Sequence, residues 1–165
     1  PGLAVAEPPR EPGFELRRRL VMLGLLVAYA WYYVCRYSLT YVGPELVRSQ
    51  GLDMRDVGFL TSVCQITIGL SKLGGSILTA DMSPSVTLAL GLVLAALCNL
   101  AAAAVPAGSP AALVPALGVI WALNGLWQGF GSPACARIID AWCRPEERGT
   151  FWSVWNTSNN IGGAL

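Results

Sequence analysis

Arg36 and two tyrosines are the residues of this sequence whose types and spacing could do chemistry. Tyr29, Tyr33 and Arg36 stand at positions i, i+4 and i+7, so a helix places them on one face. A guanidinium holds its hydrogen-bond donors in a planar fork that matches the oxygens of a phosphate, and phenol hydroxyls add further donors. The pattern therefore indicates a site for an anion, phosphate above all.

The surroundings of Arg36 are apolar. It lies in a run from Leu20 to Gly43 that holds no other charge, and these 24 residues (20 to 43) would span about 36 Å as a helix, enough to cross a bilayer. A charge at membrane depth costs at least about 2.5–3.5 kcal/mol, so it normally faces a bundle interior or a watery cavity. The alternatives are a structural ion pair and snorkelling to the interface. Because Asp81 and Asp140 are expected near the cytoplasmic ends of their spans, an external anion is the favoured partner.

The composition predicts a membrane protein. Of 165 residues, 54% are hydrophobic and 13% charged, against about 25% charged in soluble domains, and the mean hydropathy is +0.52. The expected fold class is an all-α, polytopic transmembrane helical bundle. With no His and no nucleophile–base constellation, we expect no enzyme, no metal site and no cofactor. There is no basic patch with interleaved aromatics, so no nucleic-acid partner is expected.

The five cysteines show no CxxC spacing and are expected to be small apolar packing residues; they are Cys35, Cys64, Cys98, Cys135 and Cys143.

Apolar runs and turn residues divide the chain into spans. We expect residues 1–19 to form a flexible cytoplasmic N-terminal segment, since the stretch up to Pro12 is rich in Pro, Ala and Glu. Complete spans are predicted at about 20–43, 57–79, 86–105 and 111–131, the last continuing as a helix to near Trp142. A fifth span begins near Thr150, after a loop over 144–149. The sequence does not start with Met and stops in an apolar segment, so we expect a fragment.

The basic residues predict the orientation of the spans. Four arginines precede the first span, and Arg144 and Arg148 lie in the loop after the fourth. An even number of crossings places both groups on one side, while Arg48 and Arg55 on the other side are offset by acids. By the positive-inside rule, a multi-pass integral membrane protein with a cytoplasmic N-terminus is expected.

The second predicted span carries a narrow stripe of small and polar residues, with steps of three and four. Two interpretations stay open, a close helix–helix contact and a cavity-lining face. For Lys72 the cavity is favoured over snorkelling to the interface. The stripe consists of Gly58, Ser62, Gln65, Gly69, Lys72 and Ser76.

Amides recur on one face of the last two predicted spans. In a membrane such amides either hold helices together or line a pathway, and the first is the more usual role. The residues are Asn124 and Gln128 in the fourth span and Asn156, Asn159 and Asn160 in the fifth.

Four stretches of the chain resemble the organophosphate:phosphate antiporters of the major facilitator superfamily, a family that includes glycerol-3-phosphate and hexose-phosphate antiporters and eukaryotic sugar-phosphate exchangers. The resemblance covers about residues 25–165. The stretches read YYVCRYSLTYVGPEL, LDMRDVGFLTSVCQITIGLSK, NGLWQGFGSPACARIIDAW and PEERGTFWSVWNTSNNIGGAL.

The resemblance implies a fold, an activity and site residues. Residues 20–165 would be the truncated N-terminal half of a transporter with two six-helix halves and a substrate site between them. An organic phosphate would exchange for inorganic phosphate by alternating access, and the partners would be these solutes, the lipid bilayer and the missing C-terminal half. The implied substrate-binding residues are Arg36, Tyr29, Tyr33, Lys72 and Asn159, the last at a position where bacterial members have His.

The chain departs from the family pattern beside Arg36 and after the second span. Tyr37 stands where Lys is frequent, and the loop over 79–85 carries Asp81 but no Arg. These changes concern substrate choice and a gating contact that the loop after the second span would make. Two other functions stay open on the sequence: a major facilitator carrier for a non-phosphorylated solute, and a non-transporting membrane sensor or scaffold of the same fold.

Overall fold

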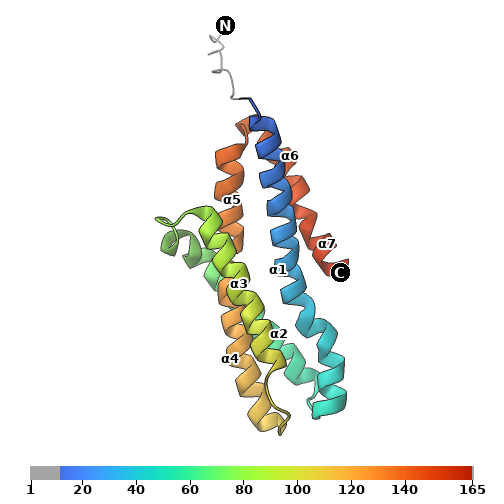
Figure 1. Ribbon diagram of the computed structural model, residues 1–165. Coiled ribbons are helices and arrows are strands. Elements are labelled where there is room, and N and C mark those ends of the chain that lie inside the picture. The colour runs from blue at the N-terminus through green and yellow to red at the C-terminus, as the bar shows by residue number, and fades with distance from the viewer. Residues whose placement is uncertain (1–11, 165) are drawn as a thin grey trace.

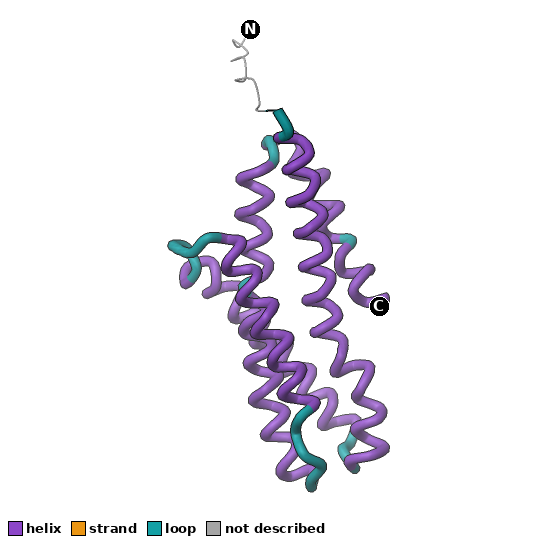
Figure 2. The backbone as a smooth tube through the Cα atoms, viewed as in Figure 1, coloured by secondary structure: helices purple, strands orange, loops and turns teal. Residues whose placement is uncertain are grey.

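The computed structural model describes residues 12–164, and within this range the chain forms only helices joined by short turns (Figures 1 and 2). The helices are α1 (Phe14–Gln50), α2 (Met54–Leu78), α3 (Pro84–Ala103), α4 (Pro110–Gly129), α5 (Gly131–Trp142), α6 (Pro145–Asn156) and α7 (Ser158–Ala164). Four segments are long and apolar enough to cross a membrane: α1, α2, α3 and α4 with α5. The predicted all-α transmembrane bundle is confirmed.

The structure changes two predicted boundaries, the start of the first span and the loop after the fourth. Residues 14–19, which the sequence assigned to the flexible N-terminal segment, are the first turns of α1; the prediction for residues 1–11 lies outside the described range. The loop expected over 144–149 is instead mostly the start of α6. Pro145 has the φ angle that the first helical position requires, and Glu146 and Glu147 complement the positive end of the helix dipole.

The first span is longer than predicted because Pro44 does not end it. α1 continues through Pro44 and stops at Gly51, whose φ of 68° is a left-handed conformation that favours glycine. α2 follows after a short turn, and the backbone N–H of Asp53 donates to Asp56 Oδ2 at 2.9 Å. The short turn makes α1 and α2 antiparallel neighbours (Figure 1).

The fourth span is one nearly continuous helix, as predicted. α4 and α5 are separated only at Phe130, which keeps helical dihedral angles of −70° and −21°. The same holds for α6 and α7, where Thr157 also keeps helical angles. In Figure 1, α6 and α7 run beside α1, while α2, α3 and α4 form the other side of the bundle.

α2 and α4 approach each other closely through glycines. A Cβ at Gly125 would collide with the Thr67 hydroxyl and the carbonyl oxygen of Cys64, and one at Gly129 would collide with Ser71. The Ser71 hydroxyl donates to the carbonyl oxygen of Leu126 at 2.6 Å. Small residues of this kind let helix backbones approach where lipid provides no hydrophobic drive for association.

Two buried clusters support the two ends of the bundle. One joins α1, α3, α5 and α6 and includes Tyr29, Tyr32 and Trp155. The other joins α1, α2 and α4 and includes Leu39, Leu60 and Trp121. On α1, Arg36 lies between Tyr32 of the first cluster and Leu39 of the second, so the helix is held on both sides of the predicted site.

Ion pairs and hydrogen bonds secure the end of the bundle that carries the start of α1. Arg18 pairs with Glu147 of α6 at 2.5 Å and with Glu15 at 2.8 Å, and its guanidinium lies 5.3 Å from the centre of the Phe151 ring. Arg137 of α5 donates to the carbonyl oxygens of residues 79, 80 and 82, just after α2. A cation there complements the negative end of the α2 dipole.

The glycine contact between α2 and α4 predicts a position-specific loss of stability. Gly125→Ala should lower the free energy of unfolding by about 1–3 kcal/mol, since backbone must move to admit a methyl group. Gly118→Ala on the same helix is the control, because its Cβ would meet only Leu60 Cδ2 at 3.9 Å. Thermal unfolding of the purified protein in detergent measures both, and equal melting temperatures for the two variants would contradict the close contact.

The Arg18–Glu147 pair predicts a pH-dependent contribution to stability. The hydrogen bond and the charge of Arg18 lower the pKa of Glu147 from its ordinary value of 4.5. The folded state therefore gains stability above that ordinary pKa and loses it as the pH falls through the lowered value. Glu147→Gln should reduce the melting temperature at pH 7, and its difference from wild type should disappear in acid. Glu146→Gln, at an exposed position beside it, loses only an interaction with the helix dipole and should reduce the melting temperature at pH 7 by less than Glu147→Gln does.

Candidate functional site

Arg36 is held by one neutral side chain and one aromatic ring. Its Nε donates to Gln128 Oε1 at 2.9 Å, and its guanidinium carbon lies 4.6 Å from the centre of the Tyr33 ring. Nη2 is buried without a hydrogen-bond partner among the described residues. The cation is thus oriented but not neutralised, and it keeps donors for an incoming acceptor.

A chain of amides fixes the orientation of Gln128. Its Nε2 donates to Asn124 Oδ1, and Asn124 Nδ2 donates to the carbonyl oxygen of Ala95 at 3.3 Å. Both amide side chains are fully buried, at 0% exposure. Because the carbonyl of Ala95 can only accept, Asn124 must turn its NH₂ toward α3 and its oxygen toward Gln128. Gln128 then has only its oxygen left to face Arg36.

The same carbonyl of Ala95 also anchors α1 through a second path. The Ser38 hydroxyl donates to Asn99 Oδ1 at 2.5 Å, and Asn99 Nδ2 donates to the carbonyl oxygen of Ala95 at 3.0 Å. α1 is therefore tied to α3 both directly and through α4. Linked hydrogen bonds of this kind, here buried or part-buried, favour one arrangement of the helices.

The predicted tyrosines form a row of rings along α1. Tyr29 meets Tyr33 edge-on at 5.5 Å, and Tyr37 stacks on Tyr33 at 5.9 Å. Tyr29 is only 3% exposed and packs at 4.4 Å against Trp155, so it belongs to the core. Tyr33 is the member that contacts Arg36. The structure therefore brings Arg36, Tyr33 and Tyr37 together and places Tyr29 next to Tyr33 in the buried core.

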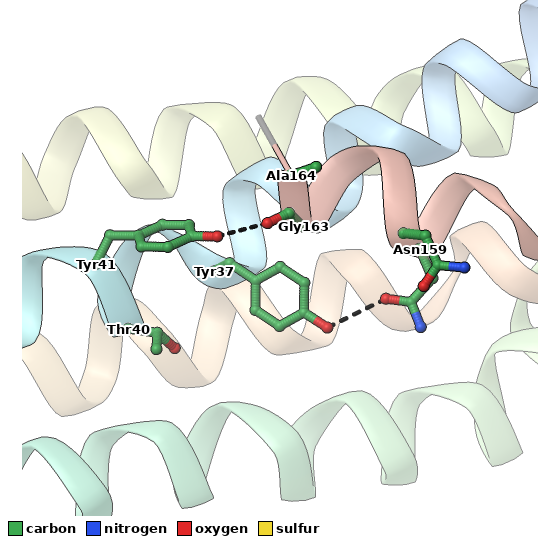
Figure 3. A pocket seen from close by; sticks show the side chains of 7 residues that line it. Tyr37, Thr40, Tyr41, Asn159, Gly163 and Ala164 are labelled. Atoms are coloured by element: carbon green, nitrogen blue, oxygen red, sulfur yellow. Dashed lines mark hydrogen bonds between the residues drawn. The ribbon is translucent and has the colours of Figure 1, made fainter.

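Two adjoining hollows open beside Arg36. The smaller, about 90 Å³, has Arg36, Thr61 and Gln65 in its lining, and the larger, about 520 Å³, has Asn159 and Asn160. Tyr37 and Thr40 line both, so the hollows adjoin at these two side chains. In the larger hollow, the Tyr37 hydroxyl donates to Asn159 Oδ1 at 3.1 Å, and the Tyr41 hydroxyl donates to the carbonyl oxygen of Gly163 at 2.6 Å (Figure 3).

The stripe on α2 is exposed along its whole length, including Lys72. Nothing lies within 4 Å of a Cβ built at Gly58 or Gly69, so among the described helices the stripe makes no close helix–helix contact. α2 instead packs on α4 through its opposite face. The exposed stripe includes Gln65, which lines the hollow of Arg36, and Lys72, which interacts with Arg36 electrostatically as a like charge.

Three residues of the candidate site were not assigned to it from the sequence. Gln128 and Asn124 were noted as amides on one face, and the signal was their spacing of four residues in an apolar helix, but nothing local identified Arg36 as their partner. Tyr37 was noted only as a departure from a pattern, and its bond to Asn159 joins α1 to α7. Within residues 12–164 no group of His, Cys, Asp or Glu could hold a metal ion.

Residues 22–165 match the family model of the Major Facilitator Superfamily, and the chain belongs to this family. The family that the sequence resembled is thereby confirmed. Relatives of the chain include proteins named as hexose phosphate, glycerol-3-phosphate and phosphoglycerate transporters, in agreement with the branch of the superfamily that the motifs indicated.

Curated relatives match nearly the whole chain. It is 34% identical over 152 residues to the probable hexose phosphate transport protein of Chlamydia trachomatis, covering 92% of this chain and 32% of that protein. It is 36% identical over 148 residues to the membrane sensor protein UhpC of Salmonella typhimurium, covering 90% and 32%. With the glycerol-3-phosphate transporter of Bacillus subtilis the identity is 30% over 155 residues, covering 94% and 34%. The chain thus spans about a third of the length of these relatives.

The amide chain predicts that Gln128 controls the charge balance of Arg36. Gln128→Glu places a carboxylate against Arg36 Nε, and the ion pair should weaken the binding of inorganic phosphate by about tenfold or more, because the anion must displace an internal partner. The melting temperature without phosphate should fall as well, because a carboxylate cannot replace the Nε2 donor to Asn124 Oδ1, so the phosphate-dependent shift is measured from the variant's own phosphate-free value. Phosphate-dependent shifts in the melting temperature of the complete protein measure this.

Gln128→Met is the matched control, since it removes the acceptor without adding a charge. It should lower the melting temperature itself, by leaving Arg36 and Asn124 without a shared partner. If Gln128→Glu binds phosphate as wild type does, Gln128 does not set the charge balance of the site.

Proposed function

We propose that the complete protein is a transmembrane carrier that exchanges an organic phosphate for inorganic phosphate by alternating access. The names of its relatives support this, because they include hexose phosphate, glycerol-3-phosphate and phosphoglycerate transporters that match 87–94% of the chain. These relatives are carriers, so the activity proposed is transport and not catalysis.

The observation that carries the proposal is that Arg36 has no acidic partner among the described residues. Its partners among the described residues are a neutral amide and an aromatic ring, and within the same residues Nη2 is buried without a hydrogen-bond partner. Removing half of an internal ion pair from a protein interior is strongly destabilising, so a cation in this setting is normally compensated. A phosphate that enters the adjoining hollow supplies both the missing charge and the missing acceptor.

The other predicted site residues have distinct parts in the proposed site. The ring of Tyr33 packs against the Arg36 guanidinium, and the buried ring of Tyr29 packs edge-on against Tyr33. Lys72 adds a second positive charge near the anion, and its like-charge interaction with Arg36 is relieved when the anion binds. Asn159 lines the larger hollow, where the organic part of the substrate would lie.

The proposed orientation has the N-terminus in the cytoplasm. The start of α1 and the turn between α5 and α6 lie at the same end of the bundle, as Arg18 and Glu147 require (Figure 1). This end collects arginines, including Arg17, Arg144 and Arg148, which fits the cytoplasmic side of a membrane protein. A second half of the protein would close the site over the exposed faces of α2 and α7.

A membrane sensor is the second candidate function, and one observation favours it. The relative named as a membrane sensor protein is 36% identical to this chain, as similar as the relatives named as transporters. A sensor would bind the same ligand without moving it across the membrane. Binding and exchange therefore have to be measured separately.

Replacing Arg36 tests the proposed function. In phosphate-loaded proteoliposomes of the complete protein, Arg36→Lys should reduce phosphate self-exchange by at least about tenfold, since a point charge does not reproduce a planar fork that is held by Gln128 and Tyr33. Arg55→Lys, at an exposed position in the first turn of α2, is the matched control and should exchange at the wild-type rate.

The outcomes separate the candidate functions. Wild-type exchange that Arg36→Lys removes supports the carrier. Binding of organic phosphate without exchange by the wild type supports the sensor. Exchange that persists near the wild-type rate in Arg36→Lys rules out the phosphate site proposed for Arg36.

A further inference from the structure

The larger hollow beside Arg36 is lined only by neutral side chains and backbone among the described residues. Tyr37, Thr40, Tyr41, Asn159 and Asn160 supply three hydroxyls and two amides, and Gly163 and Ala164 complete the wall. Its volume of about 520 Å³ falls in the range of small-molecule sites, about 300–1,000 Å³. A set of neutral donors and acceptors suits a ligand that carries hydroxyl groups.

Tyr37 is the side chain that links this hollow to Arg36. Its ring lies at 28° to the ring of Tyr33, which in turn lies beneath the Arg36 guanidinium. Its hydroxyl is held at 3.1 Å by Asn159 (Figure 3). Stacking at one end and a hydrogen bond at the other fix the ring, which lines both hollows. A fixed aromatic face beside a cation offers an apolar surface to the carbon atoms next to a bound phosphate.

The cations of the site lie away from the larger hollow. The larger hollow extends along α1 from the side of Arg36 toward Tyr41. Because α2 runs antiparallel to α1, the part of α2 beside this hollow lies toward the start of α2. Lys72 lies in the other direction along α2, two turns beyond Gln65, and it lines neither hollow. Among the described residues, a second negative group in the larger hollow would therefore meet neutral donors but no cation in the lining.

We propose that Tyr37 makes the site selective for phosphates whose organic part is neutral and hydroxylated, such as a sugar or a polyol, over phosphates that carry a carboxylate. This proposal rests on the function proposed above. The phosphate binds Arg36 in the smaller hollow, and the hydroxylated carbon skeleton passes Tyr37 into the larger one. There its hydroxyls exchange hydrogen bonds with Asn159, Asn160 and Thr40.

Competition for phosphate self-exchange tests the proposal. The complete protein is reconstituted in phosphate-loaded liposomes, and glucose 6-phosphate, glycerol 3-phosphate and 3-phosphoglycerate compete from outside. In the wild type, at least one of the two neutral-skeleton phosphates should inhibit at a concentration at least about tenfold lower than 3-phosphoglycerate. Tyr37→Lys should shift the ratio toward 3-phosphoglycerate by about tenfold or more, because it supplies a cation where the wild type has none.

Tyr37→Met is the matched control, since it removes the ring and the hydroxyl but adds no charge. It should weaken inhibition by glucose 6-phosphate without strengthening that by 3-phosphoglycerate. The inhibition of each variant is expressed relative to its own exchange without competitor, so that the order of the inhibitors is compared independently of a change in the basal exchange rate.

The outcomes distinguish the selectivity from the carrier function. Absence of phosphate self-exchange in the wild type overturns the function proposed above, and with it this inference. Self-exchange in the wild type with equal or stronger inhibition by 3-phosphoglycerate overturns the selectivity alone. So does a Tyr37→Lys variant that exchanges phosphate but keeps the wild-type order of inhibitors. If Tyr37→Lys does not fold, the wild-type order and Tyr37→Met decide.

Discussion

A positive charge that has no counter-charge among the described residues is the constraint around which this bundle is arranged. Arg36 needs support that leaves its charge free, and a neutral amide oxygen and an aromatic face provide it. That support exists only if α4 lies close to α1 at the level of Gln128. The glycines of α4 bring this helix against α2, and the buried clusters at the two ends hold α1 in place. The packing and the polar site are thus parts of one arrangement.

The four spans contribute different groups to the surroundings of Arg36. α1 contributes side chains to both hollows, α4 carries the amides that orient Arg36, and α3 contributes a backbone carbonyl that ends both paths of hydrogen bonds. α2 packs on α4 through one face and leaves its polar stripe exposed. Polar groups therefore gather at the hollows, while many large apolar side chains, such as Leu73 and Ile77 of α2, stay exposed, as a protein in lipid allows.

Much of the fold could be predicted from the sequence because it depends on local properties. The length of the apolar runs set the number of spans, and Arg36 stood out because no charge accompanies it in its run. The boundaries were less accurate, since Pro44 and Pro145 are compatible with a helix and only their surroundings decide whether it continues. Gln128 and Tyr37 were not assigned to the site because their partners, Arg36 and Asn159, lie 92 and 122 residues away in the chain. The register between helices that joins such pairs is not encoded locally.

In the amide chain between Arg36 and the carbonyl of Ala95, each amide donates on the side of α3 and accepts on the side of Arg36. The carbonyl of α3 sets this orientation, because it can only accept. An amide presents oxygen on one side and NH₂ on the other, so each link repeats the polarity of the one before it. If α3 slid along α4 and the carbonyl moved away, Asn124 and Gln128 would be free to rotate together. Gln128 would then be able to turn its NH₂ toward the guanidinium, and an attraction would become a repulsion. A small displacement between two apolar helices would thereby reverse the sign of the contact at the cation, without the movement of any charged group.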